Sequence, residues 1–232
     1  LPGIEQLAPL SDVIIIVDVL SYSTCVDIAV SSEAIIYPYK YKDDSAVEYA
    51  KSVGAELANR DRNSSGYSLS PLSLKNIPSG KKLVLPSPNG ATLSLATGSI
   101  TTICGGLRNA KAAAEYAMSI GKNISVIPSG EKWQEQDESK GSLRFAIEDL
   151  IGAGAIISFL KGSLSSESKS ALAVYESVND NLKEEIKKCS SGKELIEKGF
   201  EEDVNLACEM NVSDCVPVLN DRAYRNFTRT SL

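Results

Sequence analysis

Apolar runs of strand length alternate along the chain with segments of helical periodicity. Six runs have the length and turn-residue boundaries of buried strands. They cover residues 12–19, 34–39, 81–86, 100–104, 123–128 and 215–219. The spacing of apolar residues predicts helices over 24–31, 44–53 and 107–120, between these runs. Strands that alternate with helices predict an α/β fold with a largely parallel sheet.

From residue 142 onward the pattern is mostly helical. Residues 142–160 have the period of one long helix, and further helices are expected over 168–188, 191–199 and 201–210. No linker rich in Pro, Gly or Ser separates this part from the rest. We therefore expect residues 1–232 to form a single domain with a helix-rich second half, ending in a surface tail over 222–232.

Polar, turn-forming residues follow four of the predicted strands. Asp18 ends the first strand, and the others run into 87–91, 104–109 and 128–131. Ligands of open α/β sheets bind at the carboxyl ends of the strands. If the four strands are parallel, their ends meet at one edge and Asp18 lies in a site. The alternative is that Asp18 caps the following helix.

Two polar segments, 59–80 and 129–141, are long for connections between elements. We expect the first of them to help shape a site.

The segment 104–109 is typical of a glycine-rich turn that opens a helix. Backbone N–H groups at Gly105 and Gly106 suit a phosphate, and Arg108 would add positive charge. Gly-Gly before a helix is also common in proteins that bind no phosphate. The nucleotide-binding patterns GxxxxGK[ST] and GxGxxG do not occur in the sequence.

The chain contains no histidine. This excludes His-based triads, His general acids and His-ligated zinc sites. Any catalysis would therefore use carboxylates, hydroxyls, Lys, Arg, backbone amides or a hard metal ion.

Charge and cysteine content limit the partners and the compartment. The net charge is −6 without a basic tract, so we expect neither nucleic acid nor an anionic membrane as a partner. The apolar runs are far shorter than the roughly 18–20 residues of a membrane span. The five cysteines form no CxxC pair, and we interpret them as free thiols of a cytoplasmic protein.

Glu148 and Asp149 stand directly before a segment of small and apolar residues, 150–157. The Gly152-Ala153-Gly154 step suggests close packing, which would bring at least one carboxylate near the interior. A buried carboxylate needs a partner, for which a hard cation is suitable. The alternative is that both are surface charges.

Five segments, in order along nearly the whole chain, carry a family resemblance. They are VDVLSYSTCV (17–26), PSPNGATLSL (86–95), GGLRNAKAAAEYA (105–117), GSLRFAIEDLIGAGAI (141–156) and EEDVNLACEMNVSDCVPVL (201–219). Together they resemble the 2-phosphosulfolactate phosphatase family. The resemblance implies a three-layer α/β/α sandwich with a largely parallel or mixed sheet. It also implies a magnesium-dependent phosphatase acting on phosphate esters of 2-hydroxycarboxylic acids, such as 2-phosphosulfolactate in coenzyme M biosynthesis.

The resemblance and the chemistry together give each site residue an expected role. Asp18, Asn89 and Glu148 are expected to be catalytic, and Asp18, Glu148 and Asp149 to hold Mg²⁺. Substrate contacts are expected from Ser23, Thr24, Gly90, Gly106, Arg108, Asn109 and Arg144. Ser23 and Thr24 have the alternative of capping their helix, and Arg144 that of a helix-surface residue.

Two places depart from the family pattern. Ser21 stands where the family has an Arg, and Ser87-Pro88 precede Asn89 where threonines are usual. Arg binds an acidic group through two parallel hydrogen bonds, which Ser cannot do. The reaction class can therefore persist while the substrate differs.

Two other functions stay open on the sequence. The chain could be a non-catalytic binding protein for a small anionic metabolite, or a structural protein that binds a partner through its acidic helices over 180–203. The Gly and Ala residues of the second half suggest a homodimer.

Overall fold

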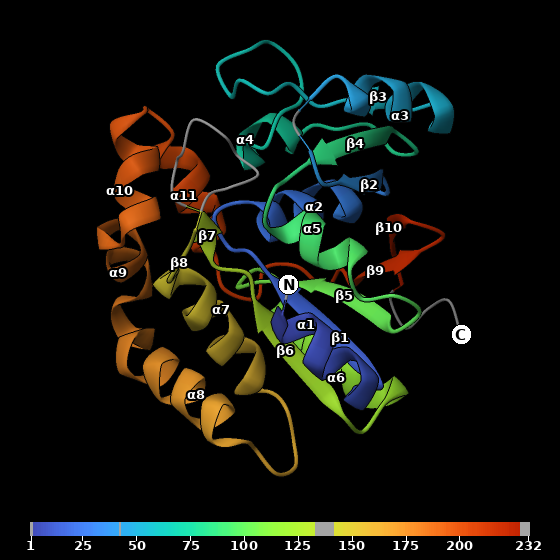
Figure 1. The fold of residues 1–232 in the computed structure, drawn as a ribbon. Helices are drawn as coiled ribbons and strands as arrows, with labels where there is room; N and C mark the ends of the chain where they lie inside the picture. The colour runs from blue at the N-terminus through green and yellow to red at the C-terminus, as the bar shows by residue number, and fades with distance from the viewer. Residues whose placement is uncertain (1, 42, 133–141, 228–232) are drawn as a thin grey trace.

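An eight-stranded mixed sheet forms the centre of the molecule, with helices on both faces (Figure 1). This computed structural model describes residues 2–41, 43–132 and 142–227. The strands lie in the order β3 (Glu56–Leu57), β4 (Lys82–Pro86), β2 (Ile35–Tyr39), β10 (Ala223–Asn226), β9 (Pro217–Asn220), β5 (Thr101–Gly105), β1 (Val13–Val17) and β6 (Ile124–Pro128). The predicted α/β/α sandwich is confirmed. Most of the polar segment 129–141 and the end of the predicted tail lie outside the described residues.

Strand β1 lies between β5 and β6 and is parallel to both. All five of its residues are buried, because helices cover both faces of the sheet. This explains why its sequence is a continuous apolar run instead of an alternating one.

The two faces of β1 pack against different helices. Ile14 and Ile16 join Ile4 of α1 (Pro2–Leu7) and Leu93 of α5 (Gly90–Leu95) in one apolar cluster. The other face packs against α6 (Ala110–Ile120) and α7 (Ile147–Ile157). Two further apolar clusters surround β2. One includes residues of α2 (Tyr22–Ser31), and the other includes residues of α3 (Ser45–Val53). The five cysteines are free thiols, as predicted, and all of them are buried.

The C-terminal hairpin corrects the predicted surface tail. Residues 223–226 form β10, which pairs antiparallel with β9 and β2, and its Tyr224 is fully buried. Four residues are too few for a periodicity to distinguish a strand from a tail, so only pairing within the sheet defines this strand. Three antiparallel pairings also separate β4 from β1. Four strands, β1, β4, β5 and β6, were expected to be parallel and to end at one edge. Of these four, only β1, β5 and β6 are parallel to one another.

The predicted long helix 142–160 is wrong at its start. Leu143–Arg144 form β8, which pairs with β7 (Glu131–Lys132), and α7 begins only at Ile147. The later helices are α8 (Ser166–Val178), α9 (Leu182–Lys188), α10 (Ser190–Glu197) and α11 (Glu201–Ala207), and a short α4 (Pro71–Leu74) lies within the predicted loop 59–80. Within the described residues, no helix is long and apolar enough to cross a membrane.

Candidate active site

Asp18 lies at the carboxyl end of β1 and is 5% exposed. Its Oδ1 accepts the backbone N–H of Tyr22 at 3.2 Å, and its Oδ2 accepts that of Gly90 at 2.9 Å. A Cβ at position 90 would lie 2.4 Å from a ring carbon of Tyr22 and 2.8 Å from Asp18 Oδ2. Only glycine therefore fits at position 90. Through its two hydrogen bonds the Asp18 carboxylate joins the starts of α2 and α5.

Burial is the main reason why the pKa of Asp18 rises from its ordinary 3.8 to about 7. The negative charge of Glu131 is the second cause, and that of Glu148 adds to it. The two backbone N–H donors act in the opposite direction but do not offset burial. Asp18 therefore lies in a cluster of carboxylates that repel one another.

Glu131 is a candidate site residue that was not among the site residues predicted from the sequence. Its Oε1 accepts a hydrogen bond from Asn89 Nδ2 at 2.5 Å, which links the segment after β4 to β7. The signal in the sequence was its place in the polar segment 128–131 after a predicted strand. Asn89, Gly90 and Glu131 thus meet around Asp18, although β4 is outside the parallel set.

Asp149 fastens the loops that follow β1 and β6. It is 3% exposed; its Oδ1 accepts the N–H of Val19 at 2.8 Å. Its Oδ2 accepts the Ser129 hydroxyl at 3.1 Å and the Gly130 N–H at 3.0 Å. Burial and the charges of Asp18 and Glu148 raise its pKa well above the ordinary value. Most of its acceptor capacity is used by these three donors.

Glu148 is also buried, which agrees with the expectation that this pair of acids is near the interior. It neighbours Cys189, whose pKa rises to about 12 through burial first and the charge of Glu148 second.

The donor set suits a hard cation, since the carboxylates of Asp18, Glu131 and Glu148 would lose their mutual repulsion on binding it. Over the described ranges, however, no group of three or more Asp, Glu, Cys or His is arranged as a metal site. Mg²⁺ commonly keeps several waters and uses one or two carboxylates together with substrate phosphate oxygens. A complete protein cage is therefore not required.

Ser23 and Thr24 are buried and hold the turn between β1 and α2. The Ser23 hydroxyl oxygen accepts the N–H of Asp18 at 2.8 Å, and Thr24 Oγ1 donates to the carbonyl of Val19 at 2.8 Å. Neither side chain caps α2. Their bonds position Asp18.

The turn 104–109 lies against Ser23, since Cys104 Sγ donates to the Ser23 hydroxyl at 3.5 Å, but its predicted phosphate-binding groups have other partners. The N–H of Gly106 donates to Asn109 Oδ1 at 2.9 Å, and Asn109 Nδ2 donates to the carbonyls of Cys104 and Cys215. Arg108 Nε donates to Asp27 at 2.8 Å, and its Nη1 pairs with Glu209. The polar groups offered to a phosphate are thus committed to internal partners.

Arg144 is 8% exposed and lies in β8, where its backbone is the register partner of Glu131 in β7. Its Nη2 contacts Glu194 at 3.0 Å and Ser191 at 3.3 Å, both on α10. The helix-surface alternative is wrong, because the side chain is buried between β8 and α10.

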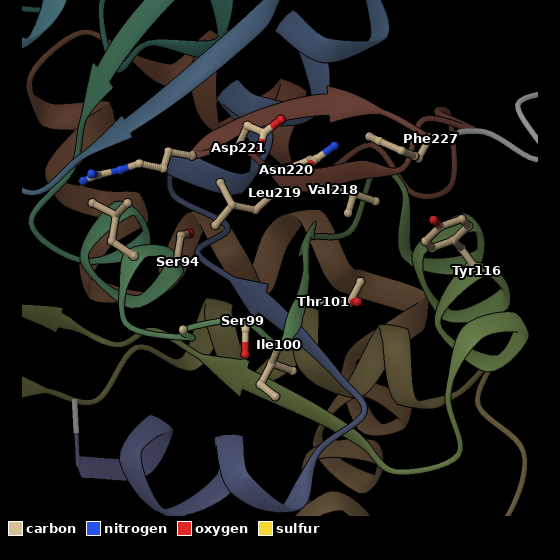
Figure 2. Close-up of a pocket in the computed structure, with 13 residues that line it drawn as sticks. Ser94, Ser99, Ile100, Thr101, Tyr116, Val218, Leu219, Asn220, Asp221 and Phe227 are labelled. Atoms are coloured by element: carbon tan, nitrogen blue, oxygen red, sulfur yellow. The ribbon is translucent and has the colours of Figure 1, made fainter.

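A cavity of about 550 Å³ lies away from these residues, between the end of α5 and the β9–β10 hairpin (Figure 2). Tyr116, Asp221, Arg222 and Phe227 are among its lining residues. None of the predicted site residues lines it, so the candidate site remains the carboxylate cluster.

Fold and site together define an α/β/α protein with buried carboxylates gathered around backbone N–H donors. The family model described as 2-phosphosulpholactate phosphatase matches residues 3–222. The chain belongs to this family, which confirms the resemblance found in the sequence. The family carries the name of a phosphoric monoester hydrolase.

Relatives with this name occur in several organisms. A probable 2-phosphosulfolactate phosphatase of Carboxydothermus hydrogenoformans is 33% identical over 88% of this chain and 84% of its own length. One of Thermotoga maritima is 32% identical over 88% of each chain. The 2-phosphosulfolactate phosphatase of Methanocaldococcus jannaschii is 27% identical over 89% of this chain and 88% of its own.

Proposed function

We propose that the chain hydrolyses phosphate monoesters of small 2-hydroxycarboxylic acids, 2-phosphosulfolactate among them, with Mg²⁺ as cofactor. The observation that supports this most is the carboxylate of Asp18, which holds the N–H groups of Tyr22 and Gly90. These bonds bring Asn89 and Glu131 to the same point. Family membership gives the reaction class.

In this proposal one or two of the carboxylates of Asp18, Glu131 and Glu148 would hold Mg²⁺, as is usual for this ion. Asp149 accepts three donors from the loops after β1 and β6 and would keep those loops in place. The bound cation would neutralise charge on the transferring phosphoryl group. No other role is assigned to it.

The remaining residues bind and orient the substrate. Asn89 uses one amide hydrogen on Glu131, which leaves the second for a phosphate oxygen. Ser23 and Asp149 keep the loops after β1 and β6 fixed, so that the phosphate meets preorganised groups.

The test is phosphate release from 2-phosphosulfolactate, 2-phospholactate and phosphoglycolate, each with Mg²⁺ and with EDTA. We expect release that EDTA abolishes. Asp18→Asn should reduce turnover by at least about a hundredfold, because it removes the negative charge that the proposal assigns to Mg²⁺. Asp12→Asn is the matched control, because Asp12 also accepts two backbone N–H groups, at 2.9 and 2.8 Å, immediately before the same strand.

Three results would contradict the proposal. Equal phosphate release in EDTA would refute the role of Mg²⁺. Full activity of Asp18→Asn would refute the assignment of the active site to the carboxylate cluster. Micromolar binding of these esters without hydrolysis would favour the anion-binding alternative.

A further inference from the structure

The proposed substrates carry a carboxylate beside the phosphate, and the candidate site is itself rich in carboxylates. A cationic side chain is needed to bind that second acidic group. Arg108 and Arg144 are held by Asp27 and Glu194. A third guanidinium, that of Arg62 on the segment 59–80, lies 3.3 Å from Ser21 in the turn that follows Asp18.

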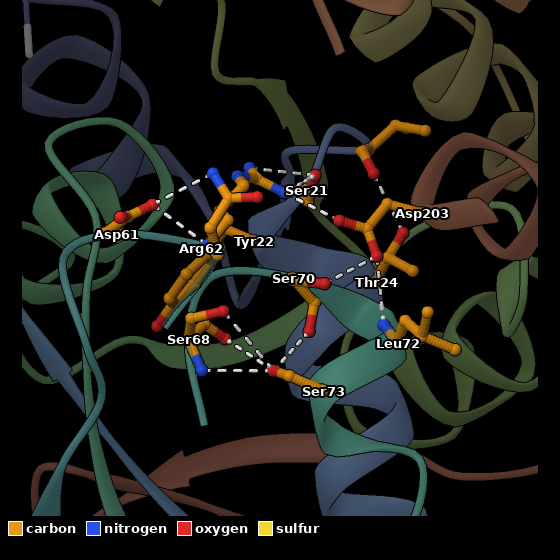
Figure 3. A network of polar contacts seen from close by, with 12 residues as sticks. Ser21, Tyr22, Thr24, Asp61, Arg62, Ser68, Ser70, Leu72, Ser73 and Asp203 are labelled. Atoms are coloured by element: carbon orange, nitrogen blue, oxygen red, sulfur yellow. Dashed lines mark hydrogen bonds and ion pairs between the residues drawn. The ribbon is translucent and has the colours of Figure 1, made fainter. Parts of the chain in front are cut away.

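Arg62 lies beside Ser21, in the turn that follows Asp18 (Figure 3). Its Nη1 and Nη2 both lie 3.3 Å from the hydroxyl oxygen of Ser21. Ser21 is three residues after Asp18, and the next residue, Tyr22, donates its N–H to that carboxylate. A segment 41 residues away in sequence from Ser21 thus brings a positive charge to this turn.

The guanidinium of Arg62 is held in position on two further sides. Nη1 is 3.1 Å from Asp203 Oδ2, and the group lies 5.7 Å from the ring centroid of Phe200. Asp203 is 1% exposed and also accepts the hydroxyl of Ser70 at 2.7 Å and the N–H of Leu72 at 3.0 Å. Asp203 therefore fixes both Arg62 and the segment that carries it, so that little rearrangement would accompany binding.

Arg62 retains capacity for a ligand. Its side chain is 18% exposed. Within the described part of the chain, its Nε has no hydrogen-bond acceptor. The bonds to Ser21 are long and end on a neutral hydroxyl, which a carboxylate with two oxygens would replace by stronger charged bonds.

We propose that Arg62 binds the carboxylate of the substrate and that Asp203 is the positioning residue that holds it there. The inference rests on the proposed function, because it concerns the second acidic group of the same esters.

The test compares two substrates that differ only in this carboxylate, 2-phospholactate and isopropyl phosphate. Arg62→Met should raise KM for 2-phospholactate at least about tenfold, as expected for a lost charged pair, with little change in kcat. KM for isopropyl phosphate should stay the same. Arg60→Met is the matched control, since Arg60 is on the same loop but 57% exposed. Arg62→Met combined with Asp203→Asn avoids leaving a buried charge unpaired, and should give the same result.

An equal loss for both substrates would show that Arg62 only fastens its loop, which would overturn the inference. An unchanged KM for 2-phospholactate would do the same. If the unchanged protein hydrolyses neither ester, the proposed function fails separately. Calorimetric binding of 2-phospholactate then decides: weaker binding by Arg62→Met supports the inference, whereas equal binding or none at all overturns it.

Discussion

Replacing Asp18 with Asn should stabilise the metal-free protein at neutral pH while it abolishes turnover. Burial and the charge of Glu131 raise the pKa of Asp18 to about 7 in the folded state, against about 3.8 when the chain is unfolded. Between these values the folded state keeps a proton that the unfolded state has lost. The free energy of unfolding therefore falls as the pH rises through this window.

The magnitude follows from the width of the window. Within this window each pH unit lowers the free energy of unfolding by about 1.4 kcal/mol. The full decrease approaches about 4 kcal/mol between pH 4 and pH 8. Asn carries no charge at any pH and has no such loss. Its amide accepts only one of the two N–H groups that Asp18 accepts, which is a constant cost of about 1–3 kcal/mol.

Urea unfolding in EDTA at pH 4, 6 and 8 measures this difference. The free energy of unfolding of Asp18→Asn, relative to the unchanged protein, should rise steadily with pH. Asp12 is the control with the opposite sign, because the N–H groups of Asn123 and Lys122 lower its pKa. Its stabilising contribution is present at neutral pH and lost on acidification. A difference for Asp18→Asn that does not change with pH would refute the reasoning.

Two glycines give further predictions. A Cβ at Gly154 would lie 2.2 Å from the carbonyl oxygen of Ala171, so Gly154→Ala must push α7 and α8 apart. We expect a loss of about 1–3 kcal/mol in urea unfolding, with no loss for Gly3→Ala, whose Cβ meets nothing within 4 Å. Gly90→Ala should displace Tyr22 and the Asp18 carboxylate and lower kcat about a hundredfold in the phosphate-release assay, and normal turnover would contradict that geometry.

The sequence determined the elements whose signal is local. The run Val13–Val17 is apolar at every position, which predicted a buried strand and, at its end, the place of Asp18. The acids Glu148 and Asp149 before a glycine-containing segment were correctly expected near the interior. These predictions succeeded because burial on both faces of a strand and close helix packing restrict neighbouring residues directly.

Tertiary structure alone decided which polar groups are available. Arg108 and Asp27 are 81 residues apart, Asn89 and Glu131 are 42 apart, and Asp149 and Val19 are 130 apart. A carboxylate, amide or guanidinium looks the same in the sequence whether it is committed to such a partner or free to bind a substrate. Its role depends on which distant donors and acceptors the sheet brings within about 3 Å, because a hydrogen bond weakens steeply beyond that distance.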